Sequence, residues 1–309
     1  MEPRKDFVVT IIPTYNRAEL LPEAIESVLA QDYPHKKMII VNDGSTDETA
    51  SVCSEYVRRY PGTVLNRQKK NGGCASARND GLNLITKEIG YVCFLDDDDR
   101  LLPGKFAREV MLLERSPEAD FTYADSIVYE DETKSERVQK VAGASIPANL
   151  AFEHFLTNEA KPAAMLYRVR AVKDRRFRED LKYNEDSEFF QRVSIECKGV
   201  YSTLPGCWVR SHGGSKSRNL IEIREAVLKT SLDIIASYPT FYHAYKEVLD
   251  RQIDRNRYSL FVELMLRGRW NEARKHASTL TQNVFSICHL NVYYQFRRFV
   301  WGSINKRRQ

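Results

Sequence analysis

Apolar runs and helix-like patterns alternate through the first 125 residues of the chain. Three runs are almost wholly apolar and rich in β-branched side chains: Phe7–Pro13, Met38–Asn42 and Tyr91–Leu95. Between the first two, apolar residues recur from Leu21 to Leu29 at the three- and four-residue spacing of one helix face. Strands without polar alternation are typical of parallel sheets that helices cover on both faces. The alternation therefore predicts an α/β fold.

The remainder of the chain is patterned less regularly. Weaker strands are expected near Thr63–Asn66 and at Phe121–Ala124, and residues 125–215 mix short strand and helix patterns. After residue 220 the pattern is mostly helical. At about 150 residues per domain, a length of 309 residues predicts two domains, or one large α/β domain with an appendage.

Composition excludes several classes of protein. Apolar residues make up 42% of the chain and charged residues 29%, which is typical of globular proteins and excludes global disorder. No apolar run approaches the roughly 20 residues of a transmembrane helix, and the charged start of the chain does not match a signal peptide. The six cysteines form no CxxC pair, which favours buried thiols over a zinc site or a disulfide framework. These features predict a cytoplasmic protein.

Positive charge is concentrated towards the end of the chain. Residues 251–309 contain 12 Lys and Arg against 3 Asp and Glu, whereas the whole chain has a net charge of +5. Within this region, apolar side chains lie largely on one predicted helical face: Tyr293, Phe296, Phe299, Val300 and Ile304. Such a segment can lie on the cytoplasmic face of an anionic membrane, and packing against the protein's own helices is the alternative. No nucleic-acid motif accompanies the charge, so nucleic acid is not expected as a partner.

Polar side chains follow three of the predicted strands at the point where each strand ends. Tyr15 lies just beyond the first strand, Asp43 directly follows the second, and Asp96–Asp99 follow the run that ends at Leu95. Ligands of open parallel sheets bind beyond the carboxyl ends of the strands, so these side chains are candidates for one binding site. Taken singly, Asp43 also fits a turn with a helix cap, and Tyr15 fits a packed loop aromatic.

The four consecutive aspartates suggest a divalent cation. Carboxylates so close together repel one another, and their hard oxygen atoms suit Mg²⁺ or Mn²⁺. The run does not fit an EF-hand loop that begins at Asp96, because position 6 of the loop would be Leu101 instead of Gly and position 12 would be Ala107. An acidic stretch that begins a helix and is stabilised by the helix dipole remains the alternative.

Four segments, taken together, resemble a known family. VVTIIPTYNRAELLPEAIESVLAQ, IIVNDGSTDET, NGGCASARNDGL and VCFLDDDDRLLPG occur in this order. They resemble family 2 glycosyltransferases of the GT-A fold, which use nucleotide sugars, and the resemblance covers residues 6 to 215. It implies a mostly parallel sheet flanked by helices, in a catalytic domain over residues 1–218 with a helical, basic C-terminal region over 219–309. Residues 1–125 would form the nucleotide-binding half of that domain and residues 126–218 the acceptor half.

The resemblance implies nucleotide-binding roles for six residues: Pro13, Tyr15, Asp43, Arg78, Asp96 and Asp97. Tyr15 would lie against the nucleobase. Asp43 would accept a hydrogen bond from N3–H of uracil, which favours UDP-sugars as donors. Asp96 or Asp97 would lie near the ribose. Because the middle residue of the family's DxD motif is itself Asp here, the register of the motif is open by one residue.

Metal-binding and catalytic roles are implied in the same way. Asp98 would be the direct metal ligand, and His212 resembles the family's histidine that reaches the metal. Asp186, in the sequence Asn184-Glu185-Asp186, resembles the base of the family's ED motif. An acidic helix N-terminus and a structural histidine are the alternatives for these positions.

These roles predict an inverting sugar transfer. Asp186 would take the proton from an acceptor hydroxyl as that hydroxyl attacks the anomeric carbon, while the cation stabilises charge on the departing diphosphate. We expect hexosyl or N-acetylhexosaminyl transfer to a saccharide or a lipid-linked saccharide, in the synthesis of cell-surface polysaccharide or glycolipid. The sequence identifies neither the sugar nor the acceptor.

Three other functions compete with this interpretation. A nucleotidyltransferase would need a Gly-rich loop after the first strand, but residues 13–22 contain no Gly. A non-catalytic nucleotide-sugar binder would lack a base or a metal site, and candidates for both are present. A membrane-spanning synthase would need transmembrane segments that the apolar runs do not provide.

Overall fold

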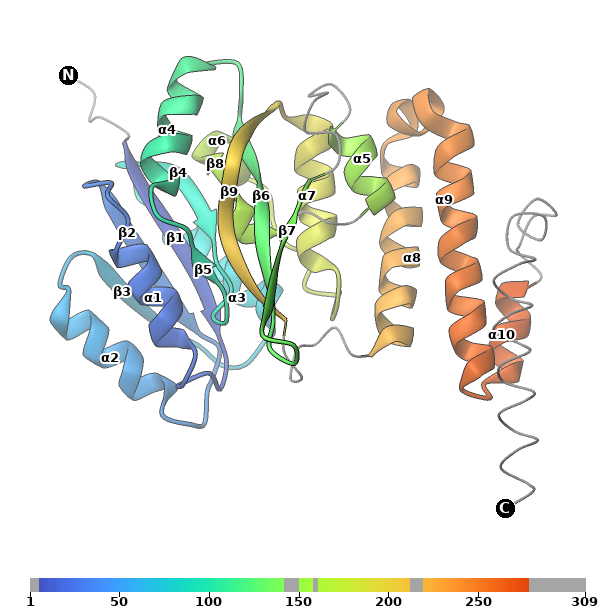
Figure 1. The fold of residues 1–309 in the computed structure, drawn as a ribbon, viewed down its shortest axis with the longest axis horizontal. Helices are drawn as coiled ribbons and strands as arrows, with labels where there is room; N and C mark the ends of the chain where they lie inside the picture. The colour runs from blue at the N-terminus through green and yellow to red at the C-terminus, as the bar shows by residue number, and fades with distance from the viewer. Residues whose placement is uncertain (1–5, 142–149, 158–160, 212–218, 278–309) are drawn as a thin grey trace. The chain divides into compact units, whose positions relative to one another are not determined.

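Nine strands form one sheet in the computed structural model, which describes residues 6–141, 150–157, 161–211 and 219–277 (Figure 1). The strand order is β3-β2-β1-β4-β8-β6-β9-β5, and β7 pairs with β6. The strands are β1 Phe7–Thr14, β2 Lys36–Asn42, β3 Val64–Gln68, β4 Ile89–Phe94, β5 Arg100–Leu101, β6 Phe121–Glu130, β7 Ser135–Gln139, β8 Met165–Arg168 and β9 Gly199–Ser211. The helices beside them are α1 Leu21–Leu29, α2 Thr49–Arg59, α3 Cys74–Asn83, α4 Lys105–Arg115, α5 Leu150–Thr157, α6 Val169–Val172 and α7 Glu185–Glu196, with a 3₁₀ turn at Pro162–Ala164.

The strands predicted from the apolar runs form the parallel part of the sheet. β3, β2, β1 and β4 are neighbours in that order and pair in parallel. Ile11 lies opposite Ile39 on one side and Phe94 on the other. Side chains of β1 and β2 are buried on both faces, which explains why these runs lack polar alternation. The α/β prediction is therefore confirmed.

The other side of the sheet is mixed. β8 runs antiparallel between β4 and β6, whereas β9 runs parallel to β6. β5 contains only two residues, directly after the aspartate run, and pairs antiparallel with β9 so that Leu101 lies opposite Cys207. Residues from before and after position 125 thus share one sheet, and the expected division of binding roles between 1–125 and 126–218 stays a prediction.

A separate hydrophobic core lies on each face of the sheet. One core packs α1, α2 and α4 against residues such as Val8 and Ile12 of β1. The other packs α3, α6 and α7 against Val9 and Ile11 of the same strand. Neighbouring residues of β1 therefore point into opposite cores, as the two-residue period of a strand requires. The two layers fix the carboxyl ends of the strands relative to the helix starts that follow them.

The chain divides into two units, Met1–Arg218 and Asn219–Gln309. In the second, α8 Leu220–Ser237 packs on α9 Pro239–Leu266, which in turn packs on α10 Trp270–Ala277. The expected C-terminal helices are therefore confirmed as far as Ala277, and α9 is kinked at Tyr245. None of the helices described is long and apolar enough to cross a membrane. The amphipathic segment predicted over 293–308 lies outside the described residues.

Candidate functional site

The ends of β1, β2 and β4 bring the predicted site residues to one edge of the sheet. These strands are adjacent and parallel, so Tyr15, Asp43 and Asp96, each just beyond a strand, follow neighbouring carboxyl ends. Pro13 is buried within β1, whereas 47% of the Tyr15 surface is exposed. The contact of the Tyr15 ring with a nucleobase stays a prediction.

The loops after β1 and β2 are joined by hydrogen bonds. Asn16 adopts a left-handed conformation with φ of 53°, which Asn tolerates better than most residues. Its backbone N–H donates to Ser45 Oγ at 3.0 Å, and its side-chain oxygen accepts from the N–H of Thr46 at 2.8 Å. The N–H of Arg17 donates to Thr49 Oγ1 at 2.9 Å. These bonds fix the segment that carries Tyr15 against the segment that follows Asp43.

The Asp43 carboxylate lies in a cradle of three donors. Lys69 Nζ donates to Oδ1 at 2.8 Å, and the backbone N–H of Gly73 donates to Oδ2 at 2.7 Å. The N–H of Gly72 lies 3.0 Å from Oδ1 and 3.2 Å from Oδ2. We call Asp43, Lys69, Gly72 and Gly73 the Asp43 cradle. Because only 4% of the Asp43 side chain is exposed, these donors supply most of its hydrogen bonding.

The aspartate run, by contrast, places four carboxylates next to one another. Burial, together with the charges of Asp98 and Asp96, raises the pKa of Asp97 to about 7, although Thr14 and Arg17 act to lower it. Burial and the charges of Asp96 and Asp98 raise the pKa of Asp99 well above its usual range. Asp99 Oδ1 accepts a hydrogen bond from the backbone N–H of Arg210 at 3.0 Å. We call Asp96–Asp99 the acidic strand end.

Arg17 approaches two of these aspartates, and its contacts with them are long. Its Nε lies 3.7 Å from Asp97 Oδ1 and its Nη2 lies 3.9 Å from Asp98 Oδ2. Across the described residues, no group of three His, Cys, Asp or Glu side chains is placed to hold a metal ion. Several carboxylates crowded beyond the end of β4 nevertheless fit a hard divalent cation that takes its remaining ligands from phosphate and water.

Arg78 joins the acidic strand end to the start of α7. Its Nη2 donates to Asp96 Oδ1 at 2.7 Å, and its Nη1 donates to Glu185 Oε1 at 3.1 Å. The guanidinium lies over the ring of Phe177, 5.2 Å from its centroid. Burial alone would lower the pKa of Arg78, but neighbouring negative groups, Asp96, Glu185 and Asp186 among them, raise it well above its usual value. The predicted contact of Arg78 with the nucleotide stays a prediction, since its described partners are carboxylates.

Asp186 lies in the first turn of α7, next to Glu185. Its Oδ1 accepts a hydrogen bond from the backbone N–H of the next residue, Ser187, at 2.7 Å, and its charge lies in an acidic first turn that the helix dipole favours. Beneath this turn, Nε2 of the buried His154 lies 3.2 Å from the carbonyl oxygen of Ser187. The His154 ring also packs edge-on against Phe190. The first turn of α7 is therefore held from α5 as well as by Arg78.

His212, the second predicted metal contact, lies outside the described residues. β9 ends one residue earlier, at Ser211. The bond between Asp99 and the backbone of Arg210 brings the end of β9 to the acidic strand end. The Arg210 side chain also donates to Glu23 at 2.8 Å, which ties β9 to α1.

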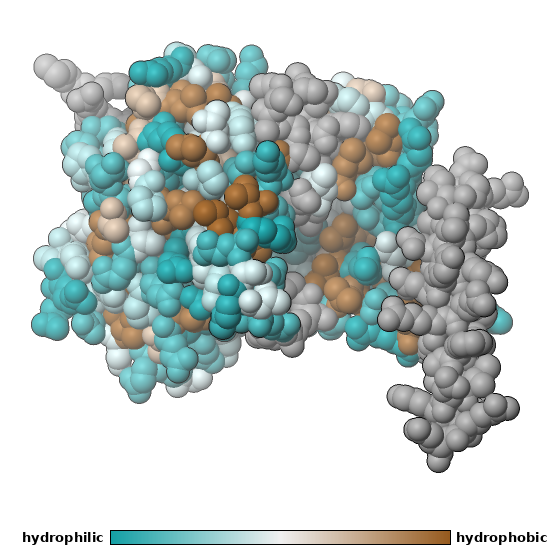
Figure 2. All heavy atoms as spheres, viewed as in Figure 1, coloured by the Kyte–Doolittle hydropathy of each residue, from teal (hydrophilic) through white to brown (hydrophobic). Residues whose placement is uncertain are grey.

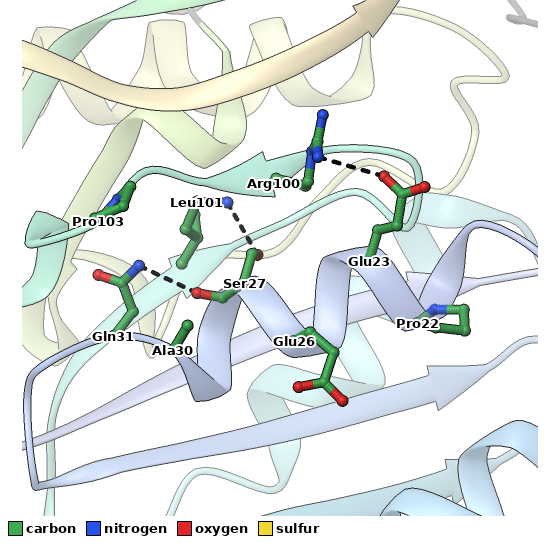
Figure 3. A pocket seen from close by; sticks show the side chains of 9 residues that line it. All are labelled: Pro22, Glu23, Glu26, Ser27, Ala30, Gln31, Arg100, Leu101 and Pro103. Atoms are coloured by element: carbon green, nitrogen blue, oxygen red, sulfur yellow. Dashed lines mark hydrogen bonds and ion pairs between the residues drawn. The ribbon is translucent and has the colours of Figure 1, made fainter.

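A groove of about 500 Å³ lies between α1 and the segment that includes β5 (Figure 3). Its polar groups bond largely to one another. Ser27 Oγ accepts from the N–H of Leu101 at 3.0 Å, and the Arg100 guanidinium lies 3.6 Å from Glu23. The lining residues include neither the Asp43 cradle nor the acidic strand end, so the groove is separate from the predicted site.

Apolar side chains on the face seen in Figure 2 form separate patches between polar ones.

Sequence reasoning missed Lys69 as a member of the site. It also named Glu185 only as a neighbour of Asp186, without its bond to Arg78. For Lys69, the available signal was its position directly after a strand and three residues before Gly72. The joining of Glu185 to Arg78 had no local signal, because 107 residues separate them.

The sequence of the chain matches a family model. The model described as "Glycosyl transferase family 2" matches residues 9–176, more than half of the chain. The chain belongs to glycosyl transferase family 2. The resemblance inferred from its four sequence segments is therefore confirmed.

Individual relatives extend the comparison. Minor teichoic acid biosynthesis protein GgaB of Bacillus subtilis is 28% identical over 291 residues, covering 84% of this chain and 32% of its own length. The chain spans about a third of the length of the first curated relatives it matches.

Two solved structures share the fold at low sequence identity. S. aureus TarS 1-349 in complex with UDP-GlcNAc has a TM-score of 0.59 and 20% identity, covering 74% of this chain and 66% of that one. A mannosyltransferase from Pyrobaculum calidifontis, in complex with GDP-Man and Mn²⁺, has a TM-score of 0.62 and 15% identity, covering 96% and 83%. Both confirm the GT-A architecture.

Proposed function

We propose that the protein is an inverting glycosyltransferase that moves a sugar from a UDP-sugar to an acceptor hydroxyl. The observation that carries the proposal is the buried Arg78, which binds Asp96 and Glu185 through two nitrogens of one guanidinium. Arg78 thereby connects the segment after β4 to the start of α7. Direct attack on an anomeric carbon requires the donor-binding edge and the candidate base to lie close together.

The donor side of the site is formed by the strand ends. Tyr15 offers an exposed ring for the nucleobase, and the Asp43 cradle lies at the end of the adjacent strand. Asp98, with His212, would hold a divalent cation beside the diphosphate. A cation bound there supplies charge stabilisation for the leaving diphosphate.

The base is assigned to Asp186. Its carboxylate is partly exposed, so an acceptor hydroxyl can reach it. Attack from the side opposite the diphosphate inverts the anomeric centre, and no covalent enzyme intermediate is required. Arg78 and the helix start keep the neighbouring carboxylates in place during proton transfer.

The substrate class rests on the relatives. GgaB is named for minor teichoic acid biosynthesis, TarS was solved with UDP-GlcNAc, and the Pyrobaculum enzyme with GDP-Man and Mn²⁺. These names favour a nucleotide sugar as donor and a cell-surface polymer or its lipid-linked precursor as acceptor. Metal dependence and the UDP-sugar are proposed for this chain on the same basis.

The test is the variant Asp186→Asn, which keeps the size of the side chain and removes the proton acceptor. A screen for hydrolysis of nucleotide sugars with Mg²⁺ or Mn²⁺ first identifies the donor. Turnover in the transfer assay is then expected to fall by about 10² to 10⁴, the usual contribution of a general base. Calorimetric binding of UDP with Mn²⁺ is expected to stay near the parent value.

Asp174→Asn is the matched control, because Asp174 is an exposed aspartate outside the proposed site. Turnover of Asp186→Asn near the parent value would contradict the assignment and make Glu185 the next candidate. Loss of UDP binding together with turnover would place Asp186 in the metal shell or in a structural role. A protein that binds nucleotide sugars and turns over none would be a binding protein instead of an enzyme.

A further inference from the structure

The Asp43 cradle contains a cation whose position is built by the chain. Lys69 directly follows β3, and only 13% of its side chain and 4% of that of Asp43 are exposed. Its Nζ donates to Asp43 Oδ1 at 2.8 Å and to the carbonyl oxygen of Lys70 at 3.0 Å. Two bonds of this length at low exposure hold the ammonium in one place instead of leaving it to sample solvent.

Glycine makes the room for this ammonium. A Cβ at position 72 would lie 2.8 Å from Lys69 Nζ, closer than real Cβ atoms come to their neighbours. Gly44, which follows Asp43 with φ of +77°, would place a Cβ 2.8 Å from the backbone N of Asn71. The turn after β2 and the turn after β3 therefore pack directly on each other, and Lys69 lies between them.

Hydrogen-bond counting shows what the cradle presents to a ligand. A carboxylate has about four acceptor sites, and the three donors Lys69, Gly72 and Gly73 already reach the Asp43 oxygens, which leaves about one site. An ammonium has three N–H donors, and Asp43 and Lys70 take two of them. Among the described residues, the cradle thus keeps one N–H of Lys69 for a ligand, beside a carboxylate that is already almost saturated.

We propose that Lys69 is a specificity-determining residue that donates its third N–H to a carbonyl oxygen of the nucleobase. The inference rests on the proposed function, because it requires a nucleotide at this edge of the sheet. Uracil offers a carbonyl oxygen at position 4 beside its N3–H, whereas cytosine offers an amino group and an unprotonated nitrogen there. A fixed ammonium can donate to the carbonyl oxygen of uracil but not to the amino group of cytosine. Asp43 holds the ammonium and also accepts a hydrogen bond from N3–H of uracil.

We expect the site to discriminate against cytosine, because a hydrogen-bond donor of the protein would then face a donor of the base. A site built to donate a hydrogen bond rejects a ligand that presents another donor, because both groups then lose their partners. Hydrogen bonds to charged groups are the stronger class. We therefore expect the parent protein to bind UDP at least about tenfold more tightly than CDP, with Lys69 responsible for most of that ratio.

The experiment measures binding of UDP and CDP by calorimetry, in the presence of Mg²⁺, to the full chain and three variants. Lys69→Met removes the donor. Lys69→Arg keeps the charge beside Asp43 but moves the donors. Lys70→Met is the matched control, since it removes the same charge from the next, exposed residue.

The expected result is a UDP-to-CDP affinity ratio that falls about tenfold in Lys69→Met and clearly in Lys69→Arg, with no change in Lys70→Met. Equal weakening of both nucleotides by Lys69→Met, with the ratio preserved, would overturn the inference and leave Lys69 as a counter-ion of Asp43. If Lys69→Met does not fold, a parent-like ratio in Lys69→Arg overturns it equally. If the parent protein binds neither UDP nor CDP, the proposed function fails before the variants are compared.

Discussion

The Asp43 cradle and the acidic strand end lie at the ends of strands in one sheet, and they differ in how many donors each carboxylate has. In the cradle, one carboxylate receives an ammonium and two backbone N–H groups, all within 3.2 Å. At the acidic strand end, four carboxylates follow one another. Arg78 donates to Asp96 at 2.7 Å, whereas Arg17 approaches Asp97 and Asp98 no closer than 3.7 Å. Burial and like charge raise the pKa of Asp97 to about 7.

The difference indicates which part of the site is complete without ligand. A carboxylate with its donors in place is preorganised, and a ligand meets it without rearrangement. Crowded carboxylates repel one another, and a divalent ion relieves that repulsion. We therefore expect the cradle to define which nucleotide binds and the acidic strand end to depend on an added cation.

The largest expected effect tests the acidic strand end through Asp98→Asn. Metal-dependent turnover should fall at least about a thousandfold, because a catalytic cation contributes several kcal/mol of charge stabilisation. Thermal melting without metal should not fall, because the change removes one of four crowded charges. The measurement is a transfer assay with Mn²⁺ beside melting in EDTA. Full parent activity in EDTA would contradict the proposed cation at the acidic strand end, and with it the difference expected between this region and the cradle.

A smaller effect is expected at the bridge between Asp96 and α7. Arg78→Met removes a buried cation shared by Asp96 and Glu185, and breaking a buried ion pair from one side typically costs about 3 kcal/mol. Urea unfolding at neutral pH measures the loss. Arg78→Lys keeps the charge, but a single ammonium cannot replace the fork that reaches both carboxylates, so an intermediate loss is expected. Parent-like stability of Arg78→Met would show that the two carboxylates do not need this bridge.

The support beneath α7 differs from both regions because it is uncharged at neutral pH. Burial lowers the pKa of His154 from 6.5 to about 4. Between these values the unfolded chain binds a proton that the folded chain does not, so stability falls as the pH drops through this window. The loss reaches about 3 kcal/mol near pH 4.

The variant His154→Gln tests this dependence. Gln can still donate to the Ser187 carbonyl oxygen but does not titrate. Urea midpoints at several pH values between 4 and 7.5 should therefore fall less steeply in the variant than in the parent. Parallel pH curves for the two proteins would contradict the prediction.

The sequence predicted the parts of the fold that are built from local patterns. β1, β2 and β4 were recognisable because both of their faces are buried, which makes the runs apolar throughout. The strand-end positions of Asp43 and Asp96 followed from the same runs. β5, with two residues, is too short to leave a pattern, and its pairing with β9 depends on residues about 100 positions away.

The contacts inside the site were less predictable than their locations. Arg78 belongs to a recognisable segment, but its partner Glu185 is fixed by the packing of α7 on the sheet and not by spacing. Lys105 and Glu109 give a further example. An i,i+4 pair usually lies on a solvated helix face. Here both side chains are fully buried, with Nζ and Oε2 2.6 Å apart, and Thr122 donates to the same oxygen.

The pairing of β5 with β9 has a consequence for synthesis of the protein on the ribosome. The aspartates and β5 emerge early, but the N–H of Arg210 that bonds Asp99 is made more than 100 residues later. At about 5–20 residues per second, the nascent chain spends several seconds with this edge of the sheet unpaired. Because long-range strand pairing is slow, this interval is when the chain is most exposed to chaperones and to misassembly. A stop codon between β5 and β9 would leave a polypeptide with every nucleotide-side strand and no completed acidic edge.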